Sequence, residues 1–164
     1  MKPVLLVIDV QKAFFTNPTT SQSINAAIEY INDAIELFRE NHLPIICIQD
    51  MDEAEGVVPG KDGFDLPQNL KILSSDLHVH KTYRNSFNKT ILAEKLRELG
   101  VDTVIITGFA AERCVLSTYR GADDLDLTPI ILREALASDN PEYIEFVERI
   151  SNIISYGSLK KVLE

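Results

Sequence analysis

The sequence predicts an α/β fold: a three-layer, doubly wound parallel sheet with helices on both faces. Two observations support this. The apolar runs at 4–8, 45–48 and 103–107 are short, continuous and rich in β-branched residues, as in strands buried on both faces. Segments with apolar residues at helical spacing alternate with these runs, which implies βαβ units and right-handed crossovers. The length of 164 residues favours one domain, taken here as 1–164.

The N-terminal part of the chain begins with the expected strand 4–8. Apolar residues then recur at helical spacing from 24 to 38, and Ser21 or Ser23 is the expected cap of that helix. The second strand, 45–48, follows.

The middle of the chain opens with a segment rich in glycine and proline, 51–68. It predicts a long loop, and loops of this length in compact domains are often functional. A short strand is expected at 77–79. A second helix is expected over 91–99, beginning near Asn88 or Thr90.

The C-terminal part predicts strand 103–107, a helix from Glu112 to about 121, and strand 129–132. Pro141 fits the first position of a last amphipathic helix that runs through 150. For these elements we expect the strand order 3-2-1-4-5.

Side chains able to do chemistry follow two strands that this order makes neighbours. Asp9 directly follows strand 4–8, and Cys114 follows strand 103–107, so both would face one crevice at the carboxyl ends of the strands. Helix N–H groups near the sulfur would favour the thiolate. Asp9 is either a general base or a cap of a neighbouring loop or helix, and Cys114 is either a nucleophile or a small buried hydrophobe.

Several basic residues have two interpretations. Lys81 would lower the pKa of the thiol and balance the charge of Asp9, or it is a solvated lysine after a short strand. Arg84, Arg113 and Arg120 would hold a substrate carboxylate or form surface salt bridges.

Bulk composition excludes several classes of partner. The net charge is −9 without a long basic block, so no nucleic acid is expected. No apolar run approaches the ~20 residues of a membrane span, and the N-terminal run lacks the features of a signal peptide. The two cysteines do not form a disulfide framework, which favours a reducing, cytoplasmic setting.

Three segments carry a family resemblance: Val7-Ile8-Asp9-Val10-Gln11-Lys12-Ala13-Phe14-Phe15, Lys81-Thr82-Tyr83-Arg84-Asn85-Ser86-Phe87, and Gly108-Phe109-Ala110-Ala111-Glu112-Arg113-Cys114-Val115-Leu116-Ser117-Thr118. They resemble the motifs of the isochorismatase-like cysteine hydrolases, among them nicotinamidases and N-carbamoylsarcosine amidases. The segments occur in the family's order, and the similarity runs from Lys2 to about Ser138.

The resemblance implies specific site residues. It implies a catalytic triad of Asp9, Lys81 and Cys114, a cis peptide bond between Phe109 and Ala110, and an oxyanion hole formed by the N–H groups of Ala110 and Cys114. The candidates for lining the substrate pocket are Phe14, Phe15, Tyr83 and Phe109.

One departure from the family concerns metal binding. Nicotinamidases carry Asp-x-His after the second strand, whereas this chain has Asp50-Met51-Asp52 and no histidine between His42 and His78. His78 and His80 have no third ligand in view, so no metal is expected. The acidic residues here, Asp50, Asp52, Glu53 and Glu55, are interpreted as a solvated loop face.

We therefore expect a cysteine-dependent hydrolase of a small amide, carbamoyl or ureide substrate that acts through a thioester and needs no cofactor. The alternatives are a vinyl-ether hydrolase of the isochorismatase kind and a non-catalytic member that binds a ligand or joins an assembly. The expected partners are a small-molecule substrate and, from the resemblance, further copies of the chain in a homo-oligomer. The loop 51–68 and a partner subunit would shape the pocket.

Overall fold

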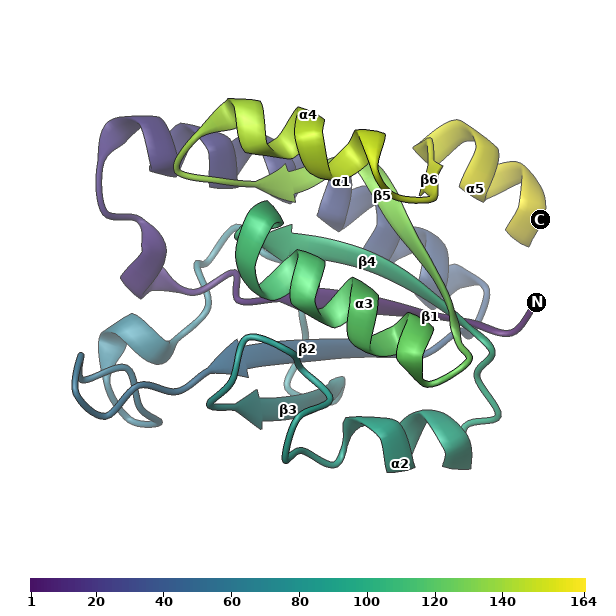
Figure 1. Ribbon diagram of the computed structural model, residues 1–164, viewed down its shortest axis with the longest axis horizontal. Helices are drawn as coiled ribbons and strands as arrows, with labels where there is room; N and C mark the ends of the chain where they lie inside the picture. The colour runs from purple at the N-terminus through teal and green to yellow at the C-terminus, as the bar shows by residue number, and fades with distance from the viewer.

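The computed structural model describes residues 1–164 and contains one parallel sheet of six strands in the order β3-β2-β1-β4-β5-β6 (Figure 1). The strands are β1 Pro3–Ile8, β2 Ile45–Asp50, β3 Leu77–Lys81, β4 Thr103–Phe109, β5 Thr128–Ala137 and β6 Ile153–Ile154. The doubly wound fold and the order of the first five strands are confirmed. The sixth strand was not expected and extends the β5 edge.

Helices cover both faces of the sheet, which gives the three expected layers. The helices are α1 Pro18–Glu40, α2 Leu92–Glu98, α3 Leu116–Asp124, α4 Pro141–Arg149 and α5 Tyr156–Leu163. Three short turns complete the list: η1 Lys12–Phe14, η2 Asp62–Phe64 and the π-helical η3 Ala111–Val115. Helices α1 and α5 share one apolar core with the sheet, and α2, α3 and α4 share the other (Figure 1). None of the helices combines the length and apolar character needed to cross a membrane.

Strand β1 shows why the apolar runs form the middle of this sheet. Leu5 and Val7 face the core beneath α1, whereas Val4, Leu6 and Ile8 face the core beneath α2 and α3. Side chains alternate between the two faces of a strand, so a strand covered on both sides must be apolar throughout. Burial of each such side chain contributes about 1.5–3 kcal/mol.

Two helix starts differ from expectation. Helix α1 begins earlier than Ser21 or Ser23, because Asn17 is its cap and Pro18 occupies its first turn. The Asn17 side chain accepts a hydrogen bond from the N–H of Thr20 at 3.0 Å. Asparagine at the cap and proline in the first turn together form a strong start signal. Helix α3 begins at Leu116 instead of Glu112, because a π-helical turn comes first.

Further differences lie at strand and chain ends. Strand β3 continues past Val79 to Lys81, because Lys81 pairs in register with Asp50 of β2. Helix α4 ends at Arg149, and the chain then adds β6 and α5, which were not expected. A strand of two residues, such as β6, is too short to give a periodic signal. Helix α2 begins at Leu92 with Ile91 at its N-cap, slightly later than the expected start near Asn88 or Thr90, although Thr90 Oγ1 accepts a hydrogen bond from the N–H of Leu92 at 3.2 Å.

Candidate active site

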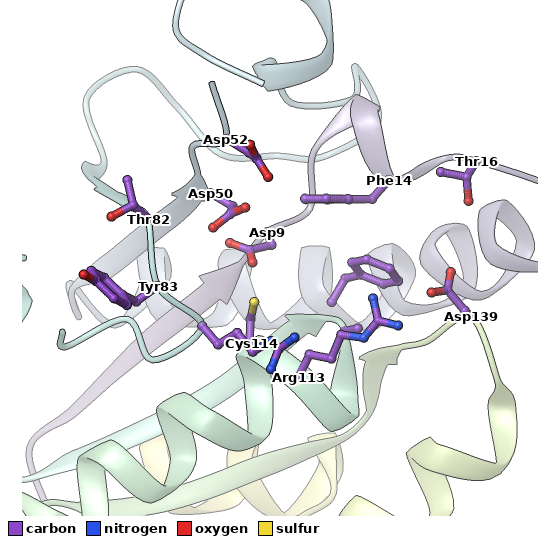
Figure 2. A pocket seen from close by; sticks show the side chains of 13 residues that line it. Asp9, Phe14, Thr16, Asp50, Asp52, Thr82, Tyr83, Arg113, Cys114 and Asp139 are labelled. Atoms are coloured by element: carbon purple, nitrogen blue, oxygen red, sulfur yellow. The ribbon is translucent and has the colours of Figure 1, made fainter. Parts of the chain in front are cut away.

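Four side chains meet where the carboxyl ends of β1, β2, β3 and β4 come together, and Figure 2 shows three of them, Asp9, Asp50 and Cys114. Asp9 follows β1, Asp50 ends β2 and Lys81 ends β3, whereas Cys114 lies in the turn η3 that comes after β4. In parallel sheets this edge is where ligands bind. The sequence-predicted residues Asp9, Lys81 and Cys114 are thus brought together, and Asp50 joins them.

The Lys81 ammonium is the centre of the group. Its Nζ lies 2.9 Å from Oδ2 of Asp9, 3.0 Å from Oδ1 of Asp50 and 3.3 Å from Sγ of Cys114. The Lys81 side chain is 0% exposed and that of Asp9 is 2% exposed. A buried charge is stable only when paired, so Lys81 is not the solvated lysine of the alternative interpretation.

The Asp9 carboxyl group is suited to exchange a proton near neutral pH. Burial raises its pKa to about 6, although the Lys81 ammonium opposes the shift. Its second oxygen, Oδ1, is buried without a hydrogen-bond partner. Asp9 itself has a positive φ of 53°, a conformation that aspartate tolerates better than most residues, and its N–H donates to Ile48 at 2.9 Å.

The Cys114 sulfur is a thiol in the resting protein. Burial and the Asp9 charge raise its pKa to about 12, because Lys81 only partly opposes them. Cys114 lies in a π-helical turn, not in the first turn of an α-helix as expected, and desolvation outweighs the effect of Lys81 on the pKa of the thiol. Burial alone would lower the pKa of Lys81, but Asp9, Cys114 and Asp50 raise it, so the lysine stays charged.

Asp50 is a site residue that sequence reasoning placed on a solvated loop. It is instead the last residue of β2, with a side chain 25% exposed at the cavity wall. The buried Gln11 fixes its backbone: Gln11 Oε1 accepts from the N–H of Asp50 at 2.8 Å, and Nε2 donates to its carbonyl at 3.0 Å. The available signal was that Asp50 comes two positions after the apolar run 45–48, much as Asp9 comes directly after the run 4–8.

The loop after β2 is tied to the same group of residues. Gln11 Nε2 donates to the carbonyl of Phe64 at 3.2 Å, and Gln49 Nε2 donates to the same carbonyl at 3.1 Å. The long connection between β2 and β3 is therefore anchored next to the site through Phe64.

A cavity of about 400 Å³ opens above the four residues, a size that suits a small molecule. Phe14 and Phe109 form one wall, with ring centroids 5.2 Å apart and an interplanar angle of 30°. Thirteen residues line the cavity: Asp9, Phe14, Thr16, Asp50, Asp52, Thr82, Tyr83, Arg84, Phe109, Ala110, Arg113, Cys114 and Asp139. Figure 2 shows the sulfur of Cys114 pointing toward Asp9, with Tyr83 and Phe14 on opposite sides.

Two of the sequence-predicted candidates lie elsewhere. Phe15 is not among the lining residues and packs against the core beneath α1. Arg120 is also absent from the cavity wall, whereas Arg84 and Arg113 belong to it. Position 15 follows the turn η1, which directs Phe14 and Phe15 to different surroundings.

The segment that carries Cys114 is fixed at both ends. Gly108 has a φ of 119°, and a Cβ there would lie 2.1 Å from the carbonyl oxygen of Ile8. The Phe109–Ala110 peptide bond is cis. Beyond it, Glu112 Oε2 accepts a hydrogen bond from Ser138 Oγ at 2.8 Å, which ties η3 to the end of β5.

Two of the three histidines, His78 and His80, have structural partners near β2. His78 bonds Gln49 Oε1 through Nδ1 at 3.2 Å and the carbonyl of Leu73 through Nε2 at 3.1 Å. His80 packs edge-on against Phe64, with centroids 5.0 Å apart. No group of three or more His, Cys, Asp or Glu side chains is arranged to hold a metal ion. Whether activity needs a metal stays a prediction.

Comparison with known proteins gives a consistent result. The model of the isochorismatase domain matches residues 3–149. An uncharacterized isochorismatase family protein, YrdC of Bacillus subtilis, is 30% identical over 139 residues, which cover 84% of this chain and 74% of YrdC. Ureidoacrylate amidohydrolase RutB of Caulobacter segnis is 29% identical over 86 residues, 52% of this chain and 36% of RutB. The structure of N-carbamoylsarcosine amidase from Thermoplasma acidophilum has the same fold, with a TM-score of 0.82 at 24% identity over 94% of this chain and 96% of that one.

Proposed function

Because the chain belongs to the isochorismatase family of hydrolases, we propose that it hydrolyses a small amide, carbamoyl or ureide substrate with Cys114 as nucleophile. The observation that carries the proposal is the buried Lys81 ammonium, 2.9 Å from Asp9 and 3.3 Å from Cys114. Amide-type substrates are supported by the names of two similar proteins, an N-carbamoylsarcosine amidase and a ureidoacrylate amidohydrolase.

The proposed reaction has two halves. In the first, the Asp9 carboxylate takes the proton of Cys114, the sulfur attacks the substrate carbonyl carbon, and a thioester forms as the C–N bond breaks. The proton on Asp9 passes to the departing nitrogen, which leaves as ammonia or an amine. In the second, Asp9 removes a proton from water and the resulting hydroxide attacks the thioester carbonyl carbon. The C–S bond then breaks, the acid product leaves, and the proton passes from Asp9 to the sulfur.

The order of these events follows from the resting protonation states. Asp9 has a pKa of about 6 and Cys114 of about 12, so proton transfer from the thiol to the carboxylate is uphill in the free protein. We infer that the proton moves as the sulfur attacks, when negative charge passes from sulfur to the substrate oxygen. Lys81 stabilises the charge on sulfur during this step.

The substrate oxygen needs donors as it becomes an oxyanion. In the proposed complex these donors are the backbone N–H groups of Ala110 and Cys114, two residues that line the cavity. Backbone N–H groups are held rigidly and so need no reorganisation during the reaction. Loss of one such donor in comparable sites costs about 3–4 kcal/mol of transition-state stabilisation.

The test is an ammonia-release screen over small amides and carbamoyl compounds with the wild-type protein, Cys114→Ala and Cys47→Ala. Cys47 is a buried cysteine of β2 that packs in the sheet, so Cys47→Ala controls for the loss of a thiol elsewhere. We expect the wild-type and Cys47→Ala proteins to release ammonia and Cys114→Ala to be inactive. Ammonia release by Cys114→Ala at the wild-type rate would refute Cys114 as nucleophile, and a vinyl-ether substrate turned over in place of amides would support the alternative reaction.

A further inference from the structure

Lys81 contacts two carboxylates, but the proposed reaction uses only one of them. Asp9 lies 2.9 Å from Nζ and exchanges the proton, whereas Asp50, at 3.0 Å, takes no part in the bond changes. We propose that Asp50 is a positioning residue that holds the Lys81 ammonium in place while Asp9 carries the proton. This inference rests on the proposed function of the site.

The backbone places Asp50 for this role. Asp50 and Lys81 are register partners in the parallel strands β2 and β3, so their side chains leave the sheet on the same face. The N–H of Met51 donates to the carbonyl of Lys81 at 2.8 Å and holds the two strand ends together. The two Gln11 hydrogen bonds described above fix the Asp50 backbone as well.

In the proposed reaction, Lys81 needs a second carboxylate partner once Asp9 is protonated, and Asp50 is that partner. Before the attack, Lys81 is flanked by two carboxylates and a neutral thiol. When Asp9 takes the proton it becomes neutral, and its attraction for the ammonium falls. No water replaces it, because the Lys81 side chain is 0% exposed. Asp50 keeps its charge throughout, so Lys81 stays beside the sulfur at the moment when the charge on sulfur must be stabilised.

The groups that contact Lys81 determine how removal of the Asp50 charge should change the pH dependence of the site. Asp9 faces Lys81 from the end of β1, Asp50 from β2 and Cys114 from η3. The Asp50 charge contributes to raising the pKa of Asp9 and that of Lys81. Removing this charge should therefore let Asp9 ionise at lower pH while leaving Lys81 less firmly held.

The experiment compares wild-type protein with Asp50→Asn and Glu53→Gln. Glu53 is an exposed acidic residue three positions after Asp50, in the loop that follows β2, and it is absent from the wall of the active-site cavity, so its variant matches the change in charge. Two quantities are measured: kcat against pH on an amide found by the screen, and the rate of Cys114 alkylation by iodoacetamide against pH. Thermal unfolding of each variant checks the fold.

We expect Asp50→Asn to lower kcat by about 10- to 100-fold, the size of loss that a small misplacement of a catalytic group produces. We also expect the lower inflection of the alkylation profile to move to lower pH, because that inflection follows the ionisation of Asp9. A purely structural role would reduce stability without moving this inflection. Glu53→Gln should change neither quantity.

The outcomes separate this inference from the proposed function. An Asp50→Asn protein with wild-type kcat, or with an unmoved alkylation inflection, would overturn the role of Asp50 even if Cys114 proves to be the nucleophile. If the wild-type protein releases no ammonia from any amide, the proposed substrate class fails. The alkylation profile needs no substrate, so a shifted inflection would still support the coupling between Asp50 and Asp9.

Discussion

The central side chains of this site carry charges that are shielded from water. Lys81 and Asp9 are almost fully buried, and each stabilises the charged form of the other. Neighbouring groups therefore titrate together, and the pKa of any one of them depends on the protonation of the rest. Substitutions here should change reactivity first and stability second.

Cys114 should react with alkylating agents before Cys47. Cys114 is partly exposed on the cavity wall, whereas Cys47 is buried in β2, where burial raises the pKa of its thiol strongly. Lys81→Ala should slow the reaction, because a positive charge that favours the thiolate is lost. Peptide mapping after brief treatment with iodoacetamide at neutral pH identifies the labelled residue. Labelling of Cys47 first would contradict the assignment.

Activity should rise with pH as Asp9 loses its proton, because the base must be ionised to accept the proton of Cys114. The midpoint of kcat/KM in the free enzyme should lie near the raised pKa of about 6, well above the ordinary range of a carboxyl group. Asp9→Asn should remove turnover, by about 100-fold or more, while substrate binding persists. A profile of kcat/KM that is flat between about pH 5 and about pH 7 would count against Asp9 as the base.

The site could be predicted from sequence only where its residues belong to local motifs. Asp9, Lys81 and Cys114 were found because each lies in a recognisable segment. The interpretation of Asp50 as a loop residue was wrong, because its contact with Lys81 depends on the register of β2 against β3, which is a non-local property. Gln11 was likewise quoted only as part of a motif, since its partners are 39 and 53 positions away.

Among the elements, the long central strands and helices were predictable because their periodicity is strong. The apolar runs of β1, β2 and β4 specify strands covered on both faces. The first residues of the helices and the short strand at the sheet edge were harder to predict from the sequence. A single cap such as Asn17 competes with nearby serines in the sequence, and β6 exists only because it pairs with β5.

The junction between β4 and the cysteine turn should not tolerate a side chain at Gly108. Gly108→Ala would place a Cβ 2.1 Å from the Ile8 carbonyl oxygen at a φ of 119°, and the strand pair would have to separate. We expect a loss of about 2–4 kcal/mol in the free energy of unfolding. The control is Gly157→Ala in α5, where nothing lies within 4 Å of the added atom.

Urea denaturation measures both variants. Gly157→Ala should be neutral or stabilising by up to about 1 kcal/mol, because alanine is the better helix former. A Gly108→Ala protein as stable as the wild type would show that β1 and β4 can move apart without cost. Because Asp9 directly follows Ile8, such movement would also change the position of the proposed base.

For the molecule as a whole, activity should not require a metal ion. Asp50 is engaged by Lys81, and no group of three or more His, Cys, Asp or Glu side chains is arranged to hold a metal ion. Exhaustive chelation followed by assay checks this. Turnover that is lost on chelation and restored by zinc, manganese or iron would contradict it.

We also expect the chain to form a homo-oligomer, and this stays a prediction. Tyr143, Phe146 and Ile150, on and just after α4, are 46%, 55% and 43% exposed. Exposed apolar side chains gathered on one helix are typical of contact surfaces. Light scattering at micromolar concentration should give a mass above 18.4 kDa, the mass of one chain. A monomer mass would refute the prediction.

The site takes residues from five separate parts of the chain. Asp9, Asp50, Lys81 and Cys114 form its central group and Asp139 lines the cavity, and each of the five comes at or after the end of a different strand, β1 to β5. No proteolytic fragment can therefore retain a working core, and transfer of one βα unit to another protein would carry a single functional group with it. The site can therefore form only when the entire sheet is present. The cavity residues Tyr83, Arg84 and Arg113 lie outside the strands, so we expect point mutations there to alter the proposed substrate preference without disturbing strand pairing.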